Sequence, residues 1–192
     1  MRTLMWIGVF SLFLFLFGMF TMKVHKPEIP SYLKTTGGDF QLESSQGTIK
    51  LSDFHGHIVL LYFGYSHCPD ICPATLNVMA SAIRLLQKDE QNDVDGLFVS
   101  LDPARDSPDK LKAYTAFFSP KIIGVTGKRE QLDAIAQQWR FTYVTPQHPK
   151  TTFYVVQHPN FLYVLNKEGH VVALLDEKST PEDVAKVVRL WL

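Results

Sequence analysis

Short apolar runs alternate with amphipathic helical stretches along this chain, and that alternation restricts its fold more than any other feature. Apolar runs predict buried strands at residues 57–65, 95–103, 122–127, 151–157, 160–166 and 170–176. Helical spacing and capping residues predict helices at 74–88, after Ser107, at 130–139 and after Thr180. Residues 39–51 predict a short hairpin in front of them. This order predicts an α/β fold, a mixed sheet flanked by helices on both faces.

Length and composition are those of one ordinary globular domain. The chain has 192 residues, 46% of them hydrophobic, which is enough to bury a substantial core. Helical spacing places Met79, Phe117 and Trp139 in that core. Basic and acidic residues balance to zero net charge, so the charge gives no indication of a nucleic-acid partner. With only two cysteines, a disulfide scaffold is excluded.

The N-terminus carries a separate signal. Residues 4–22 contain no charge, and as a helix they would measure about 28 Å, close to the ~30 Å hydrocarbon core of a bilayer. We predict a signal anchor at 1–26, containing a transmembrane helix, a tether at 27–38 and a globular domain at 39–192. A cleaved signal peptide is the alternative, but the apolar run is long and no small residues follow it. The favoured location is the bacterial inner membrane with the domain facing the periplasm, ahead of the mitochondrial inner membrane.

The strongest chemical signal is the pair Cys68 and Cys72, which follows one predicted strand and opens a predicted helix. Ligands of α/β sheets gather beyond the carboxyl ends of strands, and a helix N-terminus favours thiolate over thiol. The four-residue spacing allows both sulfurs to lie on one side of the first helical turn. Two neighbouring thiolates favour a disulfide or a soft metal ion. Two buried structural thiols are the simpler alternative.

A metal site would need a third ligand, because two sulfurs rarely complete one. The chain offers seven histidines: His25, His55, His57, His67, His148, His158 and His170. His25 precedes the domain and His170 follows a glycine turn, so both are expected on the surface. His67 adjoins Cys68 in a segment where neighbouring side chains point to opposite sides. The residues alone leave the choice of ligand open.

Three motifs follow one another along residues 54–176. They are Cys68-Pro69-Asp70-Ile71-Cys72-Pro73 preceded by FGYSH, then Asp102-Pro103-Ala104-Arg105-Asp106-Ser107-Pro108, then His158-Pro159-Asn160-Phe161-Leu162-Tyr163. Together they resemble the Sco/SenC family of membrane-anchored, thioredoxin-like copper proteins. The resemblance implies a thioredoxin-like sheet and a copper site, for Cu(I) or Cu(II), formed by Cys68, Cys72 and His158. One position departs from the family pattern: Gln157 stands where members commonly have Asp before the metal histidine, which removes a carboxylate that could tune the imidazole.

Two functions from different classes follow. The first is a copper metallochaperone that serves assembly of the binuclear copper centre of cytochrome c oxidase; its partners would be the copper-bearing oxidase subunit and possible further copper chaperones. The second is a thiol–disulfide oxidoreductase or redox sensor, in which Cys68 attacks, Cys72 resolves and a thioredoxin-like protein supplies electrons. The three-residue gap argues against a generic oxidoreductase, since such pairs are usually C-x-x-C. A thiol peroxidase is a weaker third option.

The second motif has two interpretations of its own. Asp102, Arg105 and Asp106 end a predicted strand, where local ion pairs would hold a capped turn. The functional interpretation makes them a polar rim that contacts a partner or positions the cysteine loop.

Overall fold

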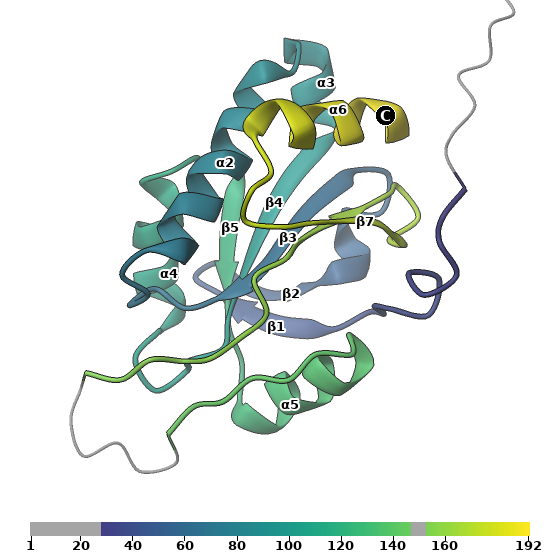
Figure 1. Ribbon diagram of the computed structural model, residues 1–192. Coiled ribbons are helices and arrows are strands. Elements are labelled where there is room, and N and C mark those ends of the chain that lie inside the picture. Colours follow the sequence, from purple (N-terminus) through teal and green to yellow (C-terminus); the bar gives the residue numbers. More distant parts are fainter. Residues whose placement is uncertain (1–27, 147–152) are drawn as a thin grey trace, which may run out of the picture.

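A five-stranded mixed sheet forms the centre of the protein, which we describe from a computed structural model over residues 28–146 and 153–192 (Figure 1). Its strands are β3 (Ile58–Gly64), β4 (Val94–Ser100), β5 (Ile122–Val125), β6 (Leu162–Leu165) and β7 (Val171–Leu175). The spatial order is β5-β4-β3-β6-β7. Strands β3, β4 and β5 run parallel, whereas β6 is antiparallel to both β3 and β7. All seven residues of β3 are buried, as expected of a central strand.

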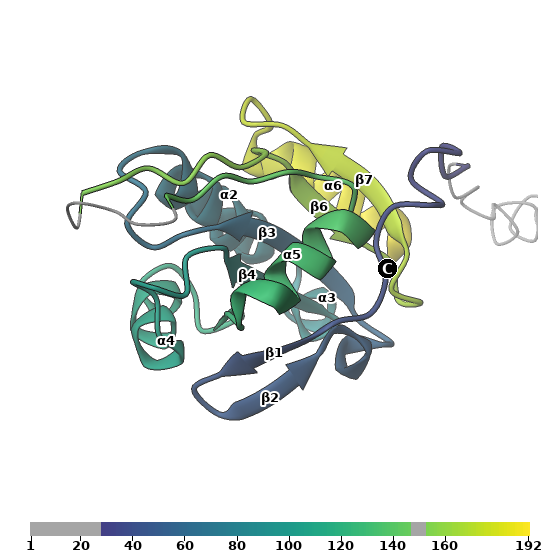
Figure 2. The same cartoon turned by 90° about the horizontal axis from the view of Figure 1, so that it is seen from below.

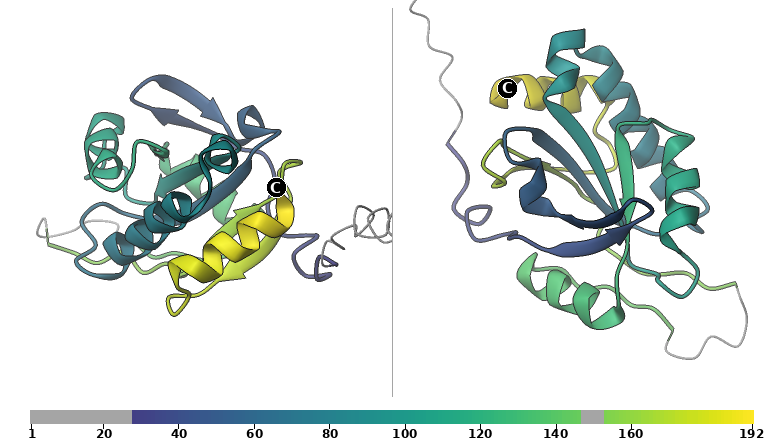
Figure 3. Two further views of the ribbon diagram at one scale, coloured as in Figure 1. Left: turned by 90° about the horizontal axis from the view of Figure 1, so that it is seen from above. Right: turned by 180° about the vertical axis from the view of Figure 1, so that it is seen from behind.

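Helices cover both faces of this sheet. They are α2 (Ile71–Leu85), α3 (Lys88–Asn92), α4 (Pro108–Ala116), α5 (Arg129–Gln138) and α6 (Pro181–Trp191). Helices α2 and α6 lie side by side on one face (Figure 3), and α5 lies on the opposite face (Figure 2). Helix α4 packs against the edge strand β5. The predicted α/β sheet flanked by helices is therefore confirmed.

The local signals for caps and turns are also confirmed. The Ser107 side chain accepts a hydrogen bond from the Lys110 backbone at the start of α4, and Thr180 does the same from Asp183 at the start of α6. The predicted hairpin forms from β1 (Gln41–Ser44) and β2 (Gly47–Lys50), followed by the 3-10 helix η1 (Leu51–Phe54).

Two predictions about the fold are wrong. Within the strand predicted at 151–157, residues 153–156 have no regular secondary structure, and Gln157 makes only an isolated bridge with Val144. Strand β3 is already paired on both edges, by β4 and β6, so this segment has no central strand left to join. Phe117 is 84% exposed, because α4 ends at Ala116 and turns Leu111 toward β5. Met79 and Trp139 are core residues as predicted.

The predicted signal anchor at 1–26, with its transmembrane helix at about 4–22, lies outside the described residues. Within residues 28–146 and 153–192, the structure has no helix of the length and apolar character needed to span a bilayer. The predicted tether contributes to the core, since Leu33 is 3% exposed within the domain's hydrophobic cluster and Ile29 packs against that cluster.

Candidate metal centre

Cys68 and Cys72 lie where the central strand β3 passes into α2. Residues 65–70, the cysteine loop, connect the two elements, and Cys72 sits in the first turn of the helix. The Cys72 backbone N–H donates to the Cys68 sulfur over 3.4 Å, and the two thiols also contact each other, although Cys68 itself precedes the helix. Both are free thiols; Cys68 is half-buried and Cys72 is fully buried.

A close approach of strand and helix fixes the position of the Cys72 sulfur. A Cβ atom on Gly64 would lie 2.9 Å from that sulfur and 2.9 Å from the Phe98 ring, so only glycine fits there without displacement. The Tyr62 hydroxyl lies 3.9 Å from the same sulfur. The inner thiol is therefore enclosed by the end of β3.

The two thiols differ in acidity. Burial by itself would raise the pKa of Cys68, but hydrogen bonds from the backbone of Asp70, Cys72 and Ile71 outweigh it and lower the pKa of Cys68 below its ordinary value. Burial dominates at Cys72 and raises its pKa to about 12. The prediction that the helix N-terminus favours the thiolate agrees with Cys68 and is wrong for Cys72.

His158 lies in residues 153–159, the segment that precedes β6, which we call the histidine segment. Its Nε2 lies 3.6 Å from the Cys72 sulfur. Its Nδ1 lies 2.9 Å from the Pro159 carbonyl oxygen. Because a carbonyl only accepts, Nδ1 carries the proton and the lone pair of Nε2 faces the sulfur. Burial lowers the pKa of His158, which keeps the ring neutral and able to bind a metal.

Aromatic and polar neighbours hold the imidazole. The rings of Tyr62 and Tyr65 meet it edge-on, with centroid distances of 6.0 and 5.8 Å. The Tyr62 hydroxyl donates to Asn160 Oδ1 over 2.7 Å, and the Asn160 amide donates to Glu177 over 2.9 Å. The sequence motifs do not reveal this chain of contacts. The available signal was a tyrosine inside an otherwise apolar strand, since a buried hydroxyl requires a partner.

The three predicted ligands are neighbours but are not arranged as a finished site. Within residues 28–146 and 153–192, the structure holds no group of three His, Cys, Asp or Glu side chains assembled to bind a metal. Cys72 faces His158, and Cys68 contacts Cys72 through the helix turn. The Cys68 sulfur and the His158 Nε2 therefore both lie next to Cys72, which is the middle member of the three donors.

The other histidines have different surroundings. His67 lies 3.1 Å from Ser66 Oγ and 3.5 Å from an Asp106 oxygen, and His57 pairs with Asp95 over 2.6 Å. His170 is exposed, as predicted. His25 and His148 lie outside the described residues. Among the described histidines, His158 is the one that the structure brings to the Cys72 thiol.

Solvent reaches the site from two directions. A cavity of about 700 Å³ is lined by His158 and Phe141 together with residues at the end of α5. A second, of about 720 Å³, is lined by His67 and Pro69 of the cysteine loop and by Arg105. A ligand or partner thus has access to both the imidazole and the loop that carries Cys68.

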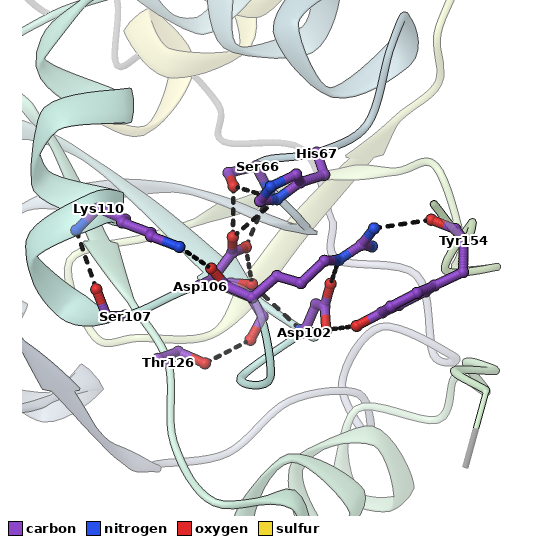
Figure 4. Close-up of polar contacts among 10 residues, drawn as sticks. Ser66, His67, Asp102, Asp106, Ser107, Lys110, Thr126 and Tyr154 are labelled. Carbon is purple, nitrogen blue, oxygen red and sulfur yellow. Dashed lines mark hydrogen bonds and ion pairs between the residues drawn. The ribbon is translucent and has the colours of Figure 1, made fainter. Parts of the chain in front are cut away.

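The second motif lies directly beneath the cysteine loop (Figure 4). Asp106 is 1% exposed and accepts a hydrogen bond from the Ser66 backbone over 2.9 Å and from Ser100 Oγ over 2.5 Å. Arg105 pairs with Asp102 over 2.5 Å. The local ion pair supports the capped-turn interpretation, and the bond of Asp106 to Ser66 supports a role in positioning the cysteine loop. Asp102 and Asp106 are each 1% exposed, so the expected polar rim is not formed by these two carboxylates.

Comparison with known proteins places this geometry in a family. The sequence model of the SCO1/SenC family matches residues 30–192. Protein sco1 of Schizosaccharomyces pombe is 37% identical over 155 residues, covering 79% of this chain and 59% of that protein. The human mitochondrial SCO1 homolog is 32% identical over 151 residues, covering 78% of this chain and 50% of that protein. The chain thus spans between half and about three fifths of these two relatives.

Solved structures agree with the sequence comparison. Copper-bound ScoI of Bradyrhizobium japonicum superposes with a TM-score of 0.73 at 30% identity, covering 82% of this chain and 99% of that one. Copper-bound yeast Sco1 gives a TM-score of 0.73 at 32% identity, covering 81% of this chain and 87% of that one. The family match spans the strand that leads to Cys68, the helix that carries Cys72 and the segment that carries His158. The chain therefore belongs to the SCO1/SenC family.

Proposed function

We propose that this protein binds one copper ion through Cys68, Cys72 and His158 and transfers it to a copper-bearing oxidase subunit. The observation that carries the proposal is the orientation of His158, whose unprotonated Nε2 faces the Cys72 sulfur at 3.6 Å. Two thiolates and one imidazole form a soft, low-coordination set that suits Cu(I) and also binds Cu(II). The copper-bound relatives from Bradyrhizobium japonicum and yeast support copper as the metal.

Copper binding on this arrangement requires a small rearrangement. The Cys72 thiol, whose pKa is raised by burial, must lose its proton, and the positive metal ion provides the compensating charge. Cys68 is half-buried, and its sulfur already contacts Cys72, so it must exchange part of its hydrogen bonding with the backbone for the metal. Transfer then proceeds by exchange of these ligands for those of the recipient.

The cellular setting follows from the family resemblance and the N-terminal sequence. We propose that residues 1–26 anchor the chain in a bacterial inner membrane and that residues 27–38 connect them to the domain at 39–192, which faces the periplasm. The recipient is the subunit that carries the binuclear copper centre of a haem–copper oxidase. This placement puts donor and recipient on the same membrane face.

The test uses the reduced full chain in detergent, loaded with copper and desalted. We expect one copper per chain, and loss of that copper in His158→Ala with both thiols still titratable. His170→Ala is the matched control, because His170 is an exposed histidine of the same domain, and it is expected to keep the metal. Equal copper content in His158→Ala and wild type would overturn the ligand assignment.

A second function is favoured by the unequal thiols. Cys68 is the more accessible and more acidic one, as the attacking thiol of a disulfide reductant must be, while Cys72 is buried next to it as a resolving thiol. In that reaction a Cys68 thiolate attacks the substrate disulfide, and Cys72 then displaces the substrate thiol to leave a Cys68–Cys72 disulfide. The His158→Ala variant separates the two functions, because it keeps both sulfurs.

A further inference from the structure

The turn between β4 and α4 is tied firmly to the cysteine loop. Asp106 accepts hydrogen bonds from the backbone and the hydroxyl of Ser66 and from Ser100 Oγ. Figure 4 shows Ser66 and His67 directly above the Asp106 carboxylate. A carboxylate that is 1% exposed and takes three donors is fixed in place, so the turn and the cysteine loop move together.

The same turn also holds the histidine segment, and it does so through Arg105. Arg105 Nη1 donates to the Tyr154 carbonyl oxygen over 3.0 Å, and its guanidinium lies 3.5 Å from the centroid of the Tyr154 ring. The Tyr154 hydroxyl donates to Asp102 Oδ1 over 2.6 Å, while Asp102 Oδ2 accepts from Arg105 Nε over 2.5 Å. Arg105 and Asp102, two residues of one turn, therefore hold the backbone, the ring and the hydroxyl of Tyr154.

Arg105 is held rigidly enough to serve this purpose. Its side chain is 11% exposed and that of Asp102 is 2% exposed, so solvent screens their ion pair little. The Tyr65 ring of the cysteine loop lies 5.5 Å from the same guanidinium. Arg105 thus stands between a tyrosine of the cysteine loop and a tyrosine of the histidine segment.

We infer that Arg105 is a positioning residue for His158: it sets the distance between the imidazole and the thiols by fixing the histidine segment to the turn that Asp106 ties to the cysteine loop. This inference rests on the proposed function for its consequence in copper binding. Tyr154 precedes His158 by only four residues, and residues 153–156 form no strand that would hold them otherwise.

Other contacts of the segment limit the expected effect. Gln157 and Val144 exchange two backbone hydrogen bonds, of 2.8 and 3.0 Å, and the Tyr65 hydroxyl bonds to the backbone of Val156. Loss of Arg105 therefore loosens the segment without releasing it. Substitution of groups that orient metal ligands lowers metal affinity by about 10- to 100-fold, and we expect the lower end for Arg105→Ala.

The first measurement needs no metal. In the reduced full chain in detergent, long-range ¹H–¹⁵N NMR reports the tautomer of each histidine, and His158 is expected as the Nδ1-protonated form. In Arg105→Ala its signals should move toward the mixed-tautomer average of an exposed histidine, while those of His170 stay unchanged. Arg105→Lys keeps the charge but lacks the planar fork, so it should resemble Arg105→Ala. Unchanged His158 signals in folded Arg105→Ala would overturn the inference.

The second measurement is a double-mutant cycle of copper affinity by competition with a Cu(I) chelator. Arg105→Ala should weaken binding about tenfold in the wild-type background and less than twofold in the His158→Ala background, where competition measures the weaker binding to the two thiols that desalting removes, because Arg105 acts through that ring. Equal losses in both backgrounds would overturn the positioning role. Arg189→Ala is the matched control, since Arg189 also joins a carbonyl, that of Leu85 at 2.7 Å, to a carboxylate, that of Glu90.

The two measurements separate this inference from the proposed function. A wild-type chain that binds no copper, with Arg105-dependent His158 signals, would overturn the copper function and uphold the positioning of His158. Copper bound through His158 with equal affinity in Arg105→Ala would uphold the function and overturn the inference. Tyr154→Phe, which removes only the hydroxyl bond to Asp102, is the milder variant if Arg105→Ala does not fold.

Discussion

The two halves of the candidate metal centre are built in different ways. The cysteine loop joins β3 to α2, so regular elements place both thiols, and a buried carboxylate fixes the loop from below. The histidine segment has no regular secondary structure at residues 153–156 and is held by one backbone bridge, by contacts of Arg105 and Asp102 with Tyr154, and by the burial of Val156. The thiol pair is thus the fixed half of the site, and the imidazole is the half that small changes can move.

This difference has a consequence for metal transfer. A carrier must hold its metal and also release it, and release is easiest if one ligand withdraws while the others stay in place. Under the proposed function His158 would be that ligand, because its segment lies outside any helix or strand at residues 153–156, whereas Cys72 lies in a helix and is enclosed between Gly64 and Tyr62. The following predictions test the contrast.

The largest expected effect is in thiol reactivity. The pKa of Cys72 is raised to about 12 by burial, whereas backbone hydrogen bonds lower the pKa of Cys68 below its ordinary value, so at neutral pH Cys68 carries far more thiolate than Cys72. The stronger nucleophilicity of the more basic thiolate offsets part of this difference. We expect iodoacetamide to modify Cys68 at least about a hundredfold faster, measured by mass spectrometry of quenched time points. Equal rates would show that the two thiols exchange environments.

The raised pKa also links stability to pH. Between the ordinary thiol value of 9.0 and about 12, the unfolded chain loses the Cys72 proton while the folded chain keeps it. This contribution is fully present below pH 9 and is lost as the pH rises toward 12. Comparing the free energy of unfolding of wild type and Cys72→Ala over this range isolates it from other groups. An identical pH dependence in both proteins would contradict the burial of this thiol.

Removal of the buried carboxylate below the cysteine loop should have the next largest effect. Asp106→Ala leaves the Ser66 backbone N–H and the Ser100 hydroxyl without their acceptor, and each buried unsatisfied group costs about 1–3 kcal/mol. We expect urea unfolding to show a loss of about 3 kcal/mol. Asp109→Ala, at an exposed carboxylate in the first turn of α4, is the control and should lose less than about 1 kcal/mol.

A smaller effect is expected where strand and helix approach. Gly64→Ala puts a methyl group 2.9 Å from the Cys72 sulfur and from the Phe98 ring, an overpacking that costs about 2 kcal/mol. In a Cys72→Ala background one of the two clashes is gone, so the same substitution should cost measurably less in thermal or urea unfolding. Equal losses in both backgrounds would show that the ring of Phe98, rather than the sulfur, sets the limit.

The sequence predicted the fixed half of the site much better than the movable half. Cys68 and Cys72 were recognisable because strand, cysteines and helix are contiguous, so local pattern determines their geometry. His158 was one of seven histidines, no local pattern marked it as a ligand, and only the family resemblance selected it. Its selection depends on contacts such as that between Tyr62 and Asn160, 98 residues apart, which no local pattern encodes.

The same reasoning explains the errors in the fold prediction. The sheet and its helices followed from periodicity, since each element buries a face that the sequence shows. The strand predicted at 151–157 was wrong because strand formation depends on a partner edge, and β6 occupies the one beside β3. The prediction that Phe117 is a core residue was wrong because the apolar character of a side chain does not show where α4 ends.

The smallest expected effect tests how the histidine segment faces the domain. Val155 is 66% exposed and Val156 is 2% exposed, so these two adjacent valines of one segment differ in whether the side chain faces solvent or the core. The shape-conserving change Val155→Thr should alter the free energy of unfolding by less than about 0.5 kcal/mol. The same change at Val156 buries a hydroxyl and should cost about 1–3 kcal/mol.

Urea unfolding of the two variants side by side checks this contrast, and copper content adds a second readout. Since Val156 lies two residues before His158, its substitution should also reduce copper retention, whereas Val155→Thr should leave it unchanged. Equal stability of the two variants would contradict the packing of Val156 against the core, and the contacts of Arg105 and the Gln157–Val144 bridge would then be a larger share of what holds the segment. In that case Arg105→Ala should weaken copper binding by more than tenfold, so the two experiments constrain each other.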